Sequence, residues 1–382
     1  MTNQILATRR GTLAGSAALL AGLSRTARAA DTIKIGMLTP LTGVGAESGQ
    51  NQRHGAQLAL DDINAKGGVL GRMLELVVED DQTSNPGSVL AFSRLASQPD
   101  IVAFIGSVRS TQVQAVAPDV LKIGKPMMFG GTDPSLTQLG NPWLFRCRPS
   151  DTYSAKVIAT YGVKTLGLKK WAIVYSTDSF GFNGNKALVA ELKALGVDPV
   201  LDQGYANQSS DFTPVAIAVR QSGADILSGY FTFEVDNATF ARQRLQLGVR
   251  IPWIGGVTLV NYSTLKLAGP SLNGVYAVPD YAVEANPTSK TFAEAYQAKY
   301  GVLPDNQSAW SFDGVNILAR GMTEANSTAP DKLRSAMLAF KGFQGAEGEY
   351  NFDKNGDGLH GYNVVRYENG KIQYLSRIDF AT

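Results

Sequence analysis

This chain of 382 residues has few of the residues that build disulfides, metal sites and nucleophilic active sites. Its one cysteine, Cys147, excludes an internal disulfide, and we interpret it as a small buried hydrophobe rather than as a nucleophile. The two histidines, His54 and His360, lie far apart, and neither has a cysteine or an acid nearby at metal-ligand spacing. A glycine-rich phosphate loop and a Gly-x-Ser-x-Gly elbow are also missing. No cofactor, no metal and no enzyme class is therefore indicated.

The chain also lacks an excess of one charge. Its formal net charge is +2, but four arginines and no acid lie in the first 29 residues. The remaining chain has 31 basic and 33 acidic residues, a net charge of −2. A nucleic-acid partner is therefore not indicated. The length predicts roughly two to three domains.

Residues 1–29 have the plan of an export signal. The pair Arg9 and Arg10 precedes an uncharged run at residues 14–23, and Ala27 and Ala29 form a small-x-small cleavage site. The arginine pair favours the twin-arginine type. The apolar run is too short for a membrane span, which needs roughly 20 residues. We therefore predict a periplasmic protein that is cleaved near Ala29.

Short apolar runs alternate with helical patterns along the rest of the chain. Five runs of strand length precede a boundary at residues 148–151, and the alternation then restarts with strands near 171–175, 226–229 and 253–255. Residues 275–282 and 342–350 could carry the chain between two lobes. A terminal hairpin is predicted to turn at Asn369 and Gly370. This order predicts an α/β fold with two doubly wound parallel sheets.

Residues 101–133 are the best candidate for a binding site. The apolar run 101–105 ends in a polar turn with Arg109 and Ser110, and a helical pattern follows. The next apolar run ends in Gly130, Gly131 and Thr132. Both turns would lie at the carboxyl edge of a parallel sheet, where such sheets bind ligands, and a helix N-terminus favours an anion such as a carboxylate. Two ordinary loops with capping residues remain the alternative.

Two acidic segments have carboxylates that a metal site could use. Residues 79–81 are Glu-Asp-Asp, and residues 353–358 resemble the start of a calcium loop. The twelfth position of that loop would be Val364, where a bidentate glutamate is required. We interpret both segments as turns.

Five segments of the mature chain are distinctive: residues 33–43 (IKIGMLTPLTG), 55–82 (GAQLALDDINAKGGVLGRMLELVVEDDQ), 104–118 (FIGSVRSTQVQAVAP), 178–183 (DSFGFN) and 352–358 (FDKNGDG). The combination of DINAKGG with the Gly-Ser-Val-x-Ser turn is the most specific feature. Through these segments the chain resembles the leucine/isoleucine/valine-binding family of periplasmic solute receptors, which serve ATP-driven importers.

This resemblance implies a type I periplasmic binding protein, with two lobes that are joined by three hinge strands and close on a solute. The first lobe would comprise residues 30–148 and 280–344, and the second residues 149–279 and 345–382. The partners would be a small solute and an ABC permease in the inner membrane. We expect a monomer.

The resemblance also implies a set of ligand-binding residues. Ser110 would bind the ligand carboxylate, with backbone groups of Gly130 and Gly131 and the hydroxyl of Thr132. Phe180 and Phe233 would cover the ligand from the second lobe. These implied positions fall on the following residues: Ser110, Gly130, Gly131, Thr132, Phe180, Phe233 and Val257.

Val257 marks a departure from the family. Amino-acid binders have a carboxylate at this position for the ligand ammonium, and a buried ammonium needs such a counter-charge or full hydrogen bonding. Recognition of an α-amino group is therefore in question. Arg109, beside Ser110, could add a charged clamp for a carboxylate. Phe180, Phe233 and the neighbouring Tyr230 and Phe231 would suit an apolar or aromatic ligand body, with core packing as the alternative.

Three functions follow. The first is a receptor for a carboxylate-bearing solute, either a branched-chain amino acid or an aromatic or aliphatic acid. The second is an amide- or urea-class receptor or sensor of the same fold, whose neutral ligand would explain the missing ammonium partner. The third, an exported hydrolase, needs a nucleophile beside a base, and no such pair is found.

Overall fold

The computed structural model describes Met1 and residues 32–380. The chain divides into a short N-terminal unit, Met1–Asp31, and one compact unit, Thr32–Thr382. Apart from Met1, the predicted export signal lies outside the described residues. None of the helices in residues 32–380 has both the length and the apolar character that a bilayer crossing requires.

The first sheet has five strands, and all of its pairings are parallel. In spatial order the strands are β2 (Leu74–Asp80), β1 (Ile33–Thr39), β3 (Ile101–Ile105), β4 (Met127–Phe129) and β5 (Leu144–Arg146). Strand β3 has the sequence IVAFI and is almost completely buried, as expected for a strand with helices on both faces. Helices α1 (Ala46–Ala65), α2 (Asn85–Ala96) and α3 (Ser110–Ile123) follow the first three strands.

The second sheet has seven strands. In spatial order they are β14 (Lys371–Asp379), β13 (Gly361–Glu368), β10 (Val275–Ala277), β9 (Trp253–Gly255), β8 (Ile226–Tyr230), β6 (Trp171–Ser176) and β7 (Leu201–Tyr205). The strands from β7 to β10 pair in parallel, and β13 and β14 add an antiparallel hairpin. The predicted turn at Asn369 and Gly370 is confirmed, and both residues have the positive φ that a type I′ hairpin turn requires. The predicted α/β fold with two parallel sheets is also confirmed.

Eight helices of more than six residues lie after β5 in the described part of the chain. They are α4 (Asp151–Thr160), α5 (Ser179–Ala194), α6 (Thr213–Gln221), α7 (Glu234–Gln246), α8 (Tyr262–Ala268), α9 (Pro287–Tyr300), α10 (Asn306–Ala325) and α11 (Pro330–Leu338). The sequence predicts a single helix near 153–166, whereas the structure begins α4 at Asp151 and ends it in a π-helical turn, Tyr161–Thr165.

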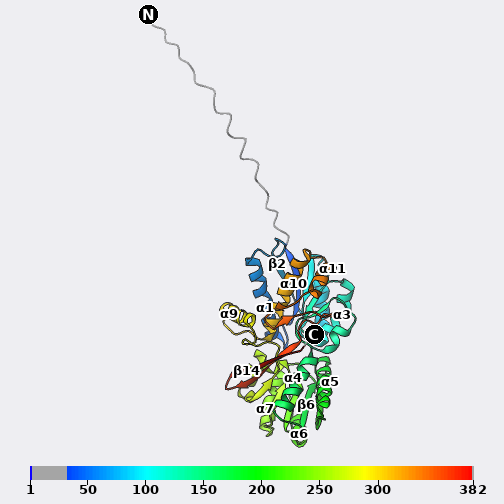
Figure 1. Cartoon of the computed structure of the whole chain (residues 1–382), viewed down its shortest axis with the longest axis vertical. Helices are drawn as coiled ribbons and strands as arrows, with labels where there is room; N and C mark the ends of the chain where they lie inside the picture. Colours follow the sequence, from blue (N-terminus) through cyan, green and yellow to red (C-terminus); the bar gives the residue numbers. More distant parts are fainter. Residues whose placement is uncertain (2–31, 381–382) are drawn as a thin grey trace. The chain divides into compact units, whose positions relative to one another are not determined.

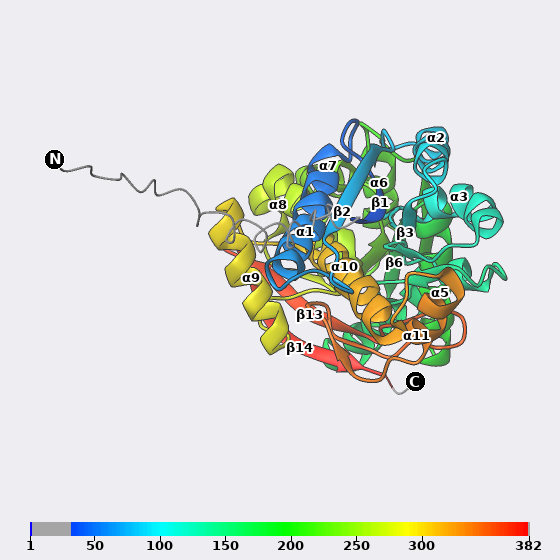
Figure 2. The same ribbon diagram turned by 90° about the horizontal axis from the view of Figure 1, so that it is seen from above.

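We call the elements around the first sheet, together with α9 to α11, the first lobe, and the elements around the second sheet the second lobe. Figure 1 shows the two groups at opposite ends of the compact unit. In the first lobe α1 packs along α10, and Figure 2 shows the two helices side by side. This contact requires Gly55, because a Cβ atom there would lie 1.9 Å from the Ser308 carbonyl oxygen.

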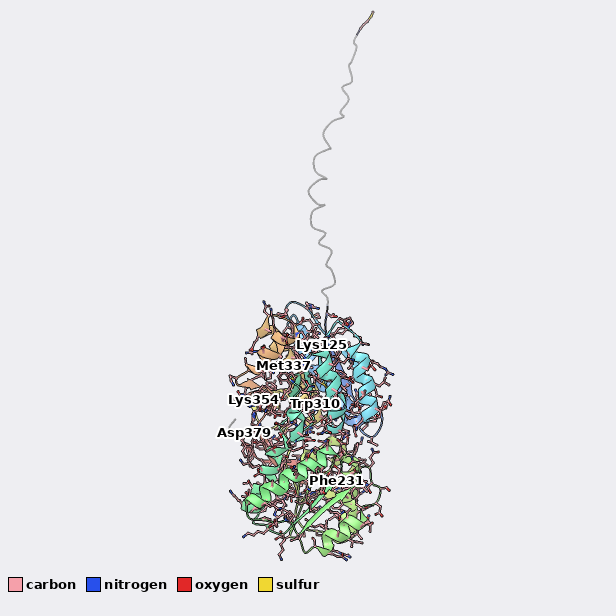
Figure 3. All side chains as sticks on the ribbon, turned by 90° about the vertical axis from the view of Figure 1, so that its right-hand side faces the viewer. Lys125, Phe231, Trp310, Met337, Lys354 and Asp379 are labelled. Carbon is pink, nitrogen blue, oxygen red and sulfur yellow. The ribbon has the colours of Figure 1, made fainter. Side chains whose placement is uncertain are left out.

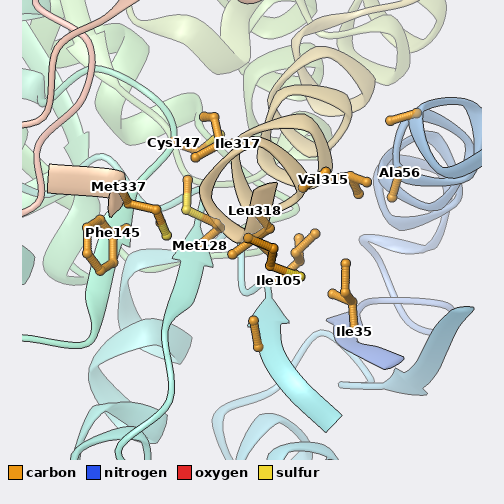
Figure 4. Close-up of a cluster of buried hydrophobic side chains, with 14 of the residues drawn as sticks. Ile35, Ala56, Ile105, Met128, Phe145, Cys147, Val315, Ile317, Leu318 and Met337 are labelled. Atoms are coloured by element: carbon orange, nitrogen blue, oxygen red, sulfur yellow. The ribbon is translucent and has the colours of Figure 1, made fainter. Parts of the chain in front are cut away.

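Each lobe has its own apolar core. In the first lobe, Ile35, Ile105 and Met128 from the sheet meet Val315 and Leu318 of α10 (Figure 4). In the second lobe, Phe231 and Phe240 pack against Trp253. Figure 3 labels Trp310 and Phe231, one from each core. Separate cores are what two lobes need in order to move as independent bodies.

Three connecting segments carry the chain between the sheets. The first follows β5, the second follows β10, and the third follows β12 (Glu349–Tyr350), which forms a short hairpin with β11 (Phe343–Gln344). Residues 342–350 are therefore mostly hairpin, and the passage itself lies after them. The segments are tied to one another, because Tyr362 donates its hydroxyl to the Pro149 carbonyl at 2.8 Å and Asn363 donates to the Asp280 carbonyl at 2.8 Å. The lobe boundaries stay predictions.

Candidate functional site

The carboxyl ends of β3 and β4 lie next to each other and bring two polar turns together. β3 leads into α3 through residues 106–109, and β4 is followed by Gly130, Gly131 and Thr132. Gly106 has a φ of 112°, and a Cβ atom there would lie 2.0 Å from the Leu38 carbonyl oxygen. The glycine therefore lets the turn sit directly on the end of β1. The N-terminus of α3 lies at this edge, and the first N–H groups of a helix have no partner among its own carbonyls.

Ser110 and Thr132 differ in what they can offer a ligand. Ser110 Oγ accepts a hydrogen bond from the Asp133 backbone N–H at 3.3 Å, so its own hydroxyl proton is free to donate. Thr132 Oγ1 instead donates to Asp151 Oδ2 at 2.7 Å. Burial raises the pKa of Asp151 to about 6. Ser110 is therefore a donor for an anion, whereas Thr132 presents acceptor lone pairs while Asp151 is ionised.

Arg109 reaches from the first lobe to the second. Its Nη1 donates to the Thr232 carbonyl at 2.9 Å, and its Nη2 lies 3.5 Å from Glu234 Oε2. The guanidinium also lies over the Phe233 ring, 4.4 Å from its centroid. Both Arg109 and Glu234 are buried. The Arg109 guanidinium, which could clamp a ligand carboxylate, is therefore already paired with Glu234 of the second lobe.

Glu234 is held from both lobes. Its Oε1 accepts hydrogen bonds from Ser48 of α1 and from Asn261 before α8, each at 3.0 Å. Two further polar contacts join the lobes: Asn183 donates to Asp133 at 2.9 Å, and Ser263 donates to Glu47 at 2.8 Å. The two lobes are therefore in contact both next to the turn after β4, through Asp133, and at the start of α1, through Glu47 and Ser48.

A cavity of about 30 Å³ lies between these turns, enough for about two water molecules. It is lined by Val108, Arg109, Ser110, Thr132, Arg148, Phe180, Thr232, Glu234, Val257, Thr258 and Gln307. The structure thus gathers five of the residues that the sequence predicted: Arg109, Ser110, Thr132, Phe180 and Val257. Whether they bind a ligand stays a prediction.

The other predicted residues lie beside the cavity and do not line it. The Gly130 carbonyl accepts a hydrogen bond from Arg148 Nη1 at 3.1 Å, and the Gly131 carbonyl accepts one from Arg146 Nη1 at 2.7 Å. Phe233 lies under the Arg109 guanidinium. Tyr230 and Phe231 belong to the core, as the alternative interpretation expected.

Arg148 is a cavity residue that sequence reasoning missed. It lies in the first connecting segment and pairs through Nε with Asp280 of the second, and both side chains are buried. Its Nη2 is buried without a hydrogen-bond partner. Burial is the largest single effect and lowers the pKa of this guanidinium, but the charges of Asp280 and Glu347 and the hydrogen bond to Asp280 together outweigh it, so the net pKa is raised and Arg148 stays charged. Arg148 therefore brings a charged side chain with one unpaired N–H donor to the cavity lining from the first connecting segment.

Glu234 was also missed, although its segment had been noted for its aromatic residues. The signal that could have found it is position, because Glu234 is the first residue of α7 and follows the end of β8. Strand ends at the carboxyl edge of a parallel sheet are ligand positions, and this rule applied to β8 as well as to β3 and β4.

The acidic segments that resembled metal sites have other partners. Asp353 caps its own turn by accepting the backbone N–H groups of Asn355 and Asp357, each at 2.9 Å. Asp357 pairs with Arg146. Asp80 accepts the Leu41 backbone N–H and the Thr42 hydroxyl. Within residues 32–380 no cluster of three or more His, Cys, Asp or Glu side chains is arranged to hold a metal.

Comparisons with known proteins agree on one family. The family described as "Periplasmic binding protein" matches residues 32–371. The leucine-, isoleucine-, valine-, threonine- and alanine-binding protein of Pseudomonas aeruginosa is 26% identical over 362 residues, which cover 92% of this chain and 94% of that protein.

Two solved structures have the same fold. A periplasmic binding protein type 1 from Bordetella pertussis superposes with a TM-score of 0.83 at 27% identity, covering 90% of this chain and 100% of that chain. A leucine-binding protein from Thermotoga maritima superposes with a TM-score of 0.85 at 24% identity, covering 91% of this chain and 99% of that one.

Proposed function

Because this chain belongs to the periplasmic binding protein family, we propose that it is the substrate-binding protein of an ABC importer and captures a small carboxylate-bearing solute between its lobes. The relatives are periplasmic binding proteins, and several are named for the amino acids that they bind. Export of this chain, an inner-membrane permease partner, a monomeric state and the lobe boundaries at residues 148, 279 and 344 belong to the proposal. It assigns no catalytic activity.

The observation that carries the proposal is the set of donors at the first-lobe edge. Ser110, the first residue of α3, and Arg148 both line the cavity; the Ser110 hydroxyl proton is free to donate, and Nη2 of Arg148 has no hydrogen-bond partner. Donors from a helix N-terminus and a guanidinium favour a carboxylate over a neutral group. Phe180 and Val257 supply an apolar wall from the second lobe.

The size of the cavity supports a hinge mechanism. About 30 Å³ is too small for a solute with several carbon atoms, so the lobes must separate to admit one. The interlobe contacts of Arg109, Asn183 and Ser263 would break on opening and re-form around the solute. Closure would then create the surface that a permease recognises.

The first test compares an acid with its amide. Calorimetry on the mature chain with 4-methylpentanoate and 4-methylpentanamide should detect binding of the acid and much weaker binding of the amide. The acid should bind more tightly because a neutral ligand gains less from Arg148 and the helix N-terminus. Tighter binding of the amide would instead favour the amide- or urea-class receptor.

A second prediction concerns Ser110→Ala. Loss of a hydrogen bond to a charged group costs about 1.5–3 kcal/mol, so the affinity for a bound carboxylate should fall about 10- to 100-fold. Ser97→Ala is a matched control, because Ser97 is exposed at the end of α2. Equal affinities of the Ser110→Ala variant and the wild type would remove Ser110 from the site.

A further inference from the structure

The turn between β8 and α7 has the parts of a cation-binding subsite. Thr232 presents a backbone carbonyl, Phe233 an aromatic face, and Glu234 a carboxylate that is 5% exposed. A carbonyl, a ring face and a buried carboxylate are the groups that hold a cation away from water. Within the described residues that line the cavity, Glu234 is the sole acid.

Arg109 already fills this subsite. Its guanidinium makes all three contacts: 2.9 Å to the Thr232 carbonyl, 4.4 Å to the Phe233 centroid and 3.5 Å to Glu234 Oε2. The other carboxylate oxygen of Glu234 is bonded by Ser48 and Asn261. The charge of Glu234 is therefore balanced from within the chain, by a residue of the opposite lobe.

From this arrangement we infer that Arg109 stands in for a ligand cation and that the solute is a carboxylic acid without an α-ammonium group. The inference rests on the proposed function. An incoming ammonium would have to displace the guanidinium, which would leave the buried Arg109 charge without its partner. A ligand without an ammonium can bind while the Arg109–Glu234 pair stays intact.

The remaining polar groups fit the same solute. Arg109 Nε and Arg148 Nη2 are buried without hydrogen-bond partners, and the Ser110 hydroxyl is free to donate. These three donors need acceptors, which a carboxylate supplies. Val257 stands among the lining residues on the second-lobe side with an apolar side chain. The solute is thus an aliphatic or aromatic acid whose body meets Phe180 and Val257.

The test uses pairs that differ only in the amino group. Calorimetry on the mature wild-type chain compares 4-methylpentanoate with leucine, and 3-phenylpropanoate with phenylalanine. At least one acid should bind at least about tenfold more tightly than its amino acid, as expected when a buried ion pair must be broken. Leucine or phenylalanine binding as tightly as its acid would overturn the inference and leave the proposed function standing. If neither the acids nor the amino acids bind, the proposed function itself fails.

Variants of the pair supply an independent readout. Arg109→Ala should empty the subsite, so the affinity ratio of acid to amino acid should fall at least about tenfold. Arg109→Ala should thus raise the affinity for the amino acid relative to the acid. In the double variant Arg109→Ala/Glu234→Gln this increase should disappear, because the carboxylate that would bind the ammonium is gone. Arg250→Ala, at an exposed position of the second lobe, should leave the ratio unchanged. Thermal unfolding of each variant checks that it is folded, and an unchanged ratio in folded Arg109→Ala would overturn the inference.

Discussion

Arg148→Met is expected to lower the free energy of unfolding by about 3–5 kcal/mol, because removing one partner of a buried ion pair leaves the other charge uncompensated. Asp280 would be that charge, since its side chain is buried and Arg148 is its ion-pair partner. The Gly130 carbonyl would also lose the donor from Nη1. Methionine keeps most of the aliphatic stem, so the effect reports the charge and the hydrogen bonds. Urea unfolding followed by circular dichroism measures the change.

Two variants make this measurement specific. Arg320→Met removes an arginine that is exposed on α10 and pairs with Glu324 one turn away, and it should cost less than about 1 kcal/mol. The double variant Arg148→Met/Asp280→Leu should recover much of the loss, because neither member of the pair is then left as an uncompensated charge. A cost for Arg148→Met as small as that of Arg320→Met would show that the pair does not stabilise the fold.

Arg148→Met should also weaken solute binding, measured on the folded fraction, since Arg148 also lines the cavity.

Much of the site could be predicted from local sequence because it follows one geometric rule. Apolar runs that end in small polar residues indicated where β3 and β4 stop, and neighbouring parallel strands bring such ends to the same edge. The position of Ser110 at the first residue of α3 follows from this rule. The resemblance extended it to Phe180 and Val257 across the cleft, and the family match confirms the resemblance itself.

The residues that escaped prediction are those whose role depends on a partner far away in the chain. Arg148 was seen only as part of a boundary, but it acts by meeting Asp280, 132 residues later. Arg109 was expected to clamp a ligand carboxylate, whereas its guanidinium contacts residues 123 and 125 positions away. No periodicity in the sequence encodes such pairings, because they arise only when segments far apart in the chain fold together.

One strand also escaped prediction, for a local reason. β7 has the sequence LDQGY at the edge of the second sheet, and only Tyr205 is buried. An edge strand with an aspartate and a glycine has neither the apolar run of a central strand nor a clear alternation. Its neighbour β6, WAIVYS, is almost fully buried and was predicted.

Stability is expected to increase as the pH falls from 8 to 5.5, against the usual behaviour of carboxylates in ion pairs. Asp313 of α10 is buried and accepts hydrogen bonds from the Ala346 and Glu347 backbone N–H groups and from the Tyr350 hydroxyl. Burial outweighs these bonds and raises the pKa of Asp313 to about 7. Burial likewise raises the pKa of Asp151 to about 6.

A carboxyl group with a raised folded-state pKa takes up a proton on folding. Its stabilising contribution is complete below the unfolded pKa near 4 and is lost as the pH rises through the folded pKa, here about 6 to 7. Between pH 8 and 5.5, Asp313 should therefore add about 2 kcal/mol and Asp151 about 1 kcal/mol. Burial lowers the pKa of His54 and His360, which opposes part of this gain below pH 6.5. Burial also raises the pKa of Asp81 and Asp236 to about 6, so both add to the gain, and the net gain should be at least about 2 kcal/mol in urea unfolding.

The variant Asp313→Asn distinguishes the effect of protonating Asp313 from the effect of the packing and hydrogen bonds around it. The variant should be less stable at every pH, because an amide cannot accept from all three donors, but its pH dependence should be weaker by about 2 kcal/mol over the same range. Asp211→Asn is the control: a hydrogen bond from Thr213 lowers the pKa of Asp211, so its titration lies below this window. If Asp313→Asn keeps the full pH dependence, the carboxyl group of Asp313 is not the group that titrates in this window. Because the hairpin of β11 and β12 carries Glu347 and precedes the third connecting segment, loss of the dependence would show that this proton binds where α10 meets that hairpin.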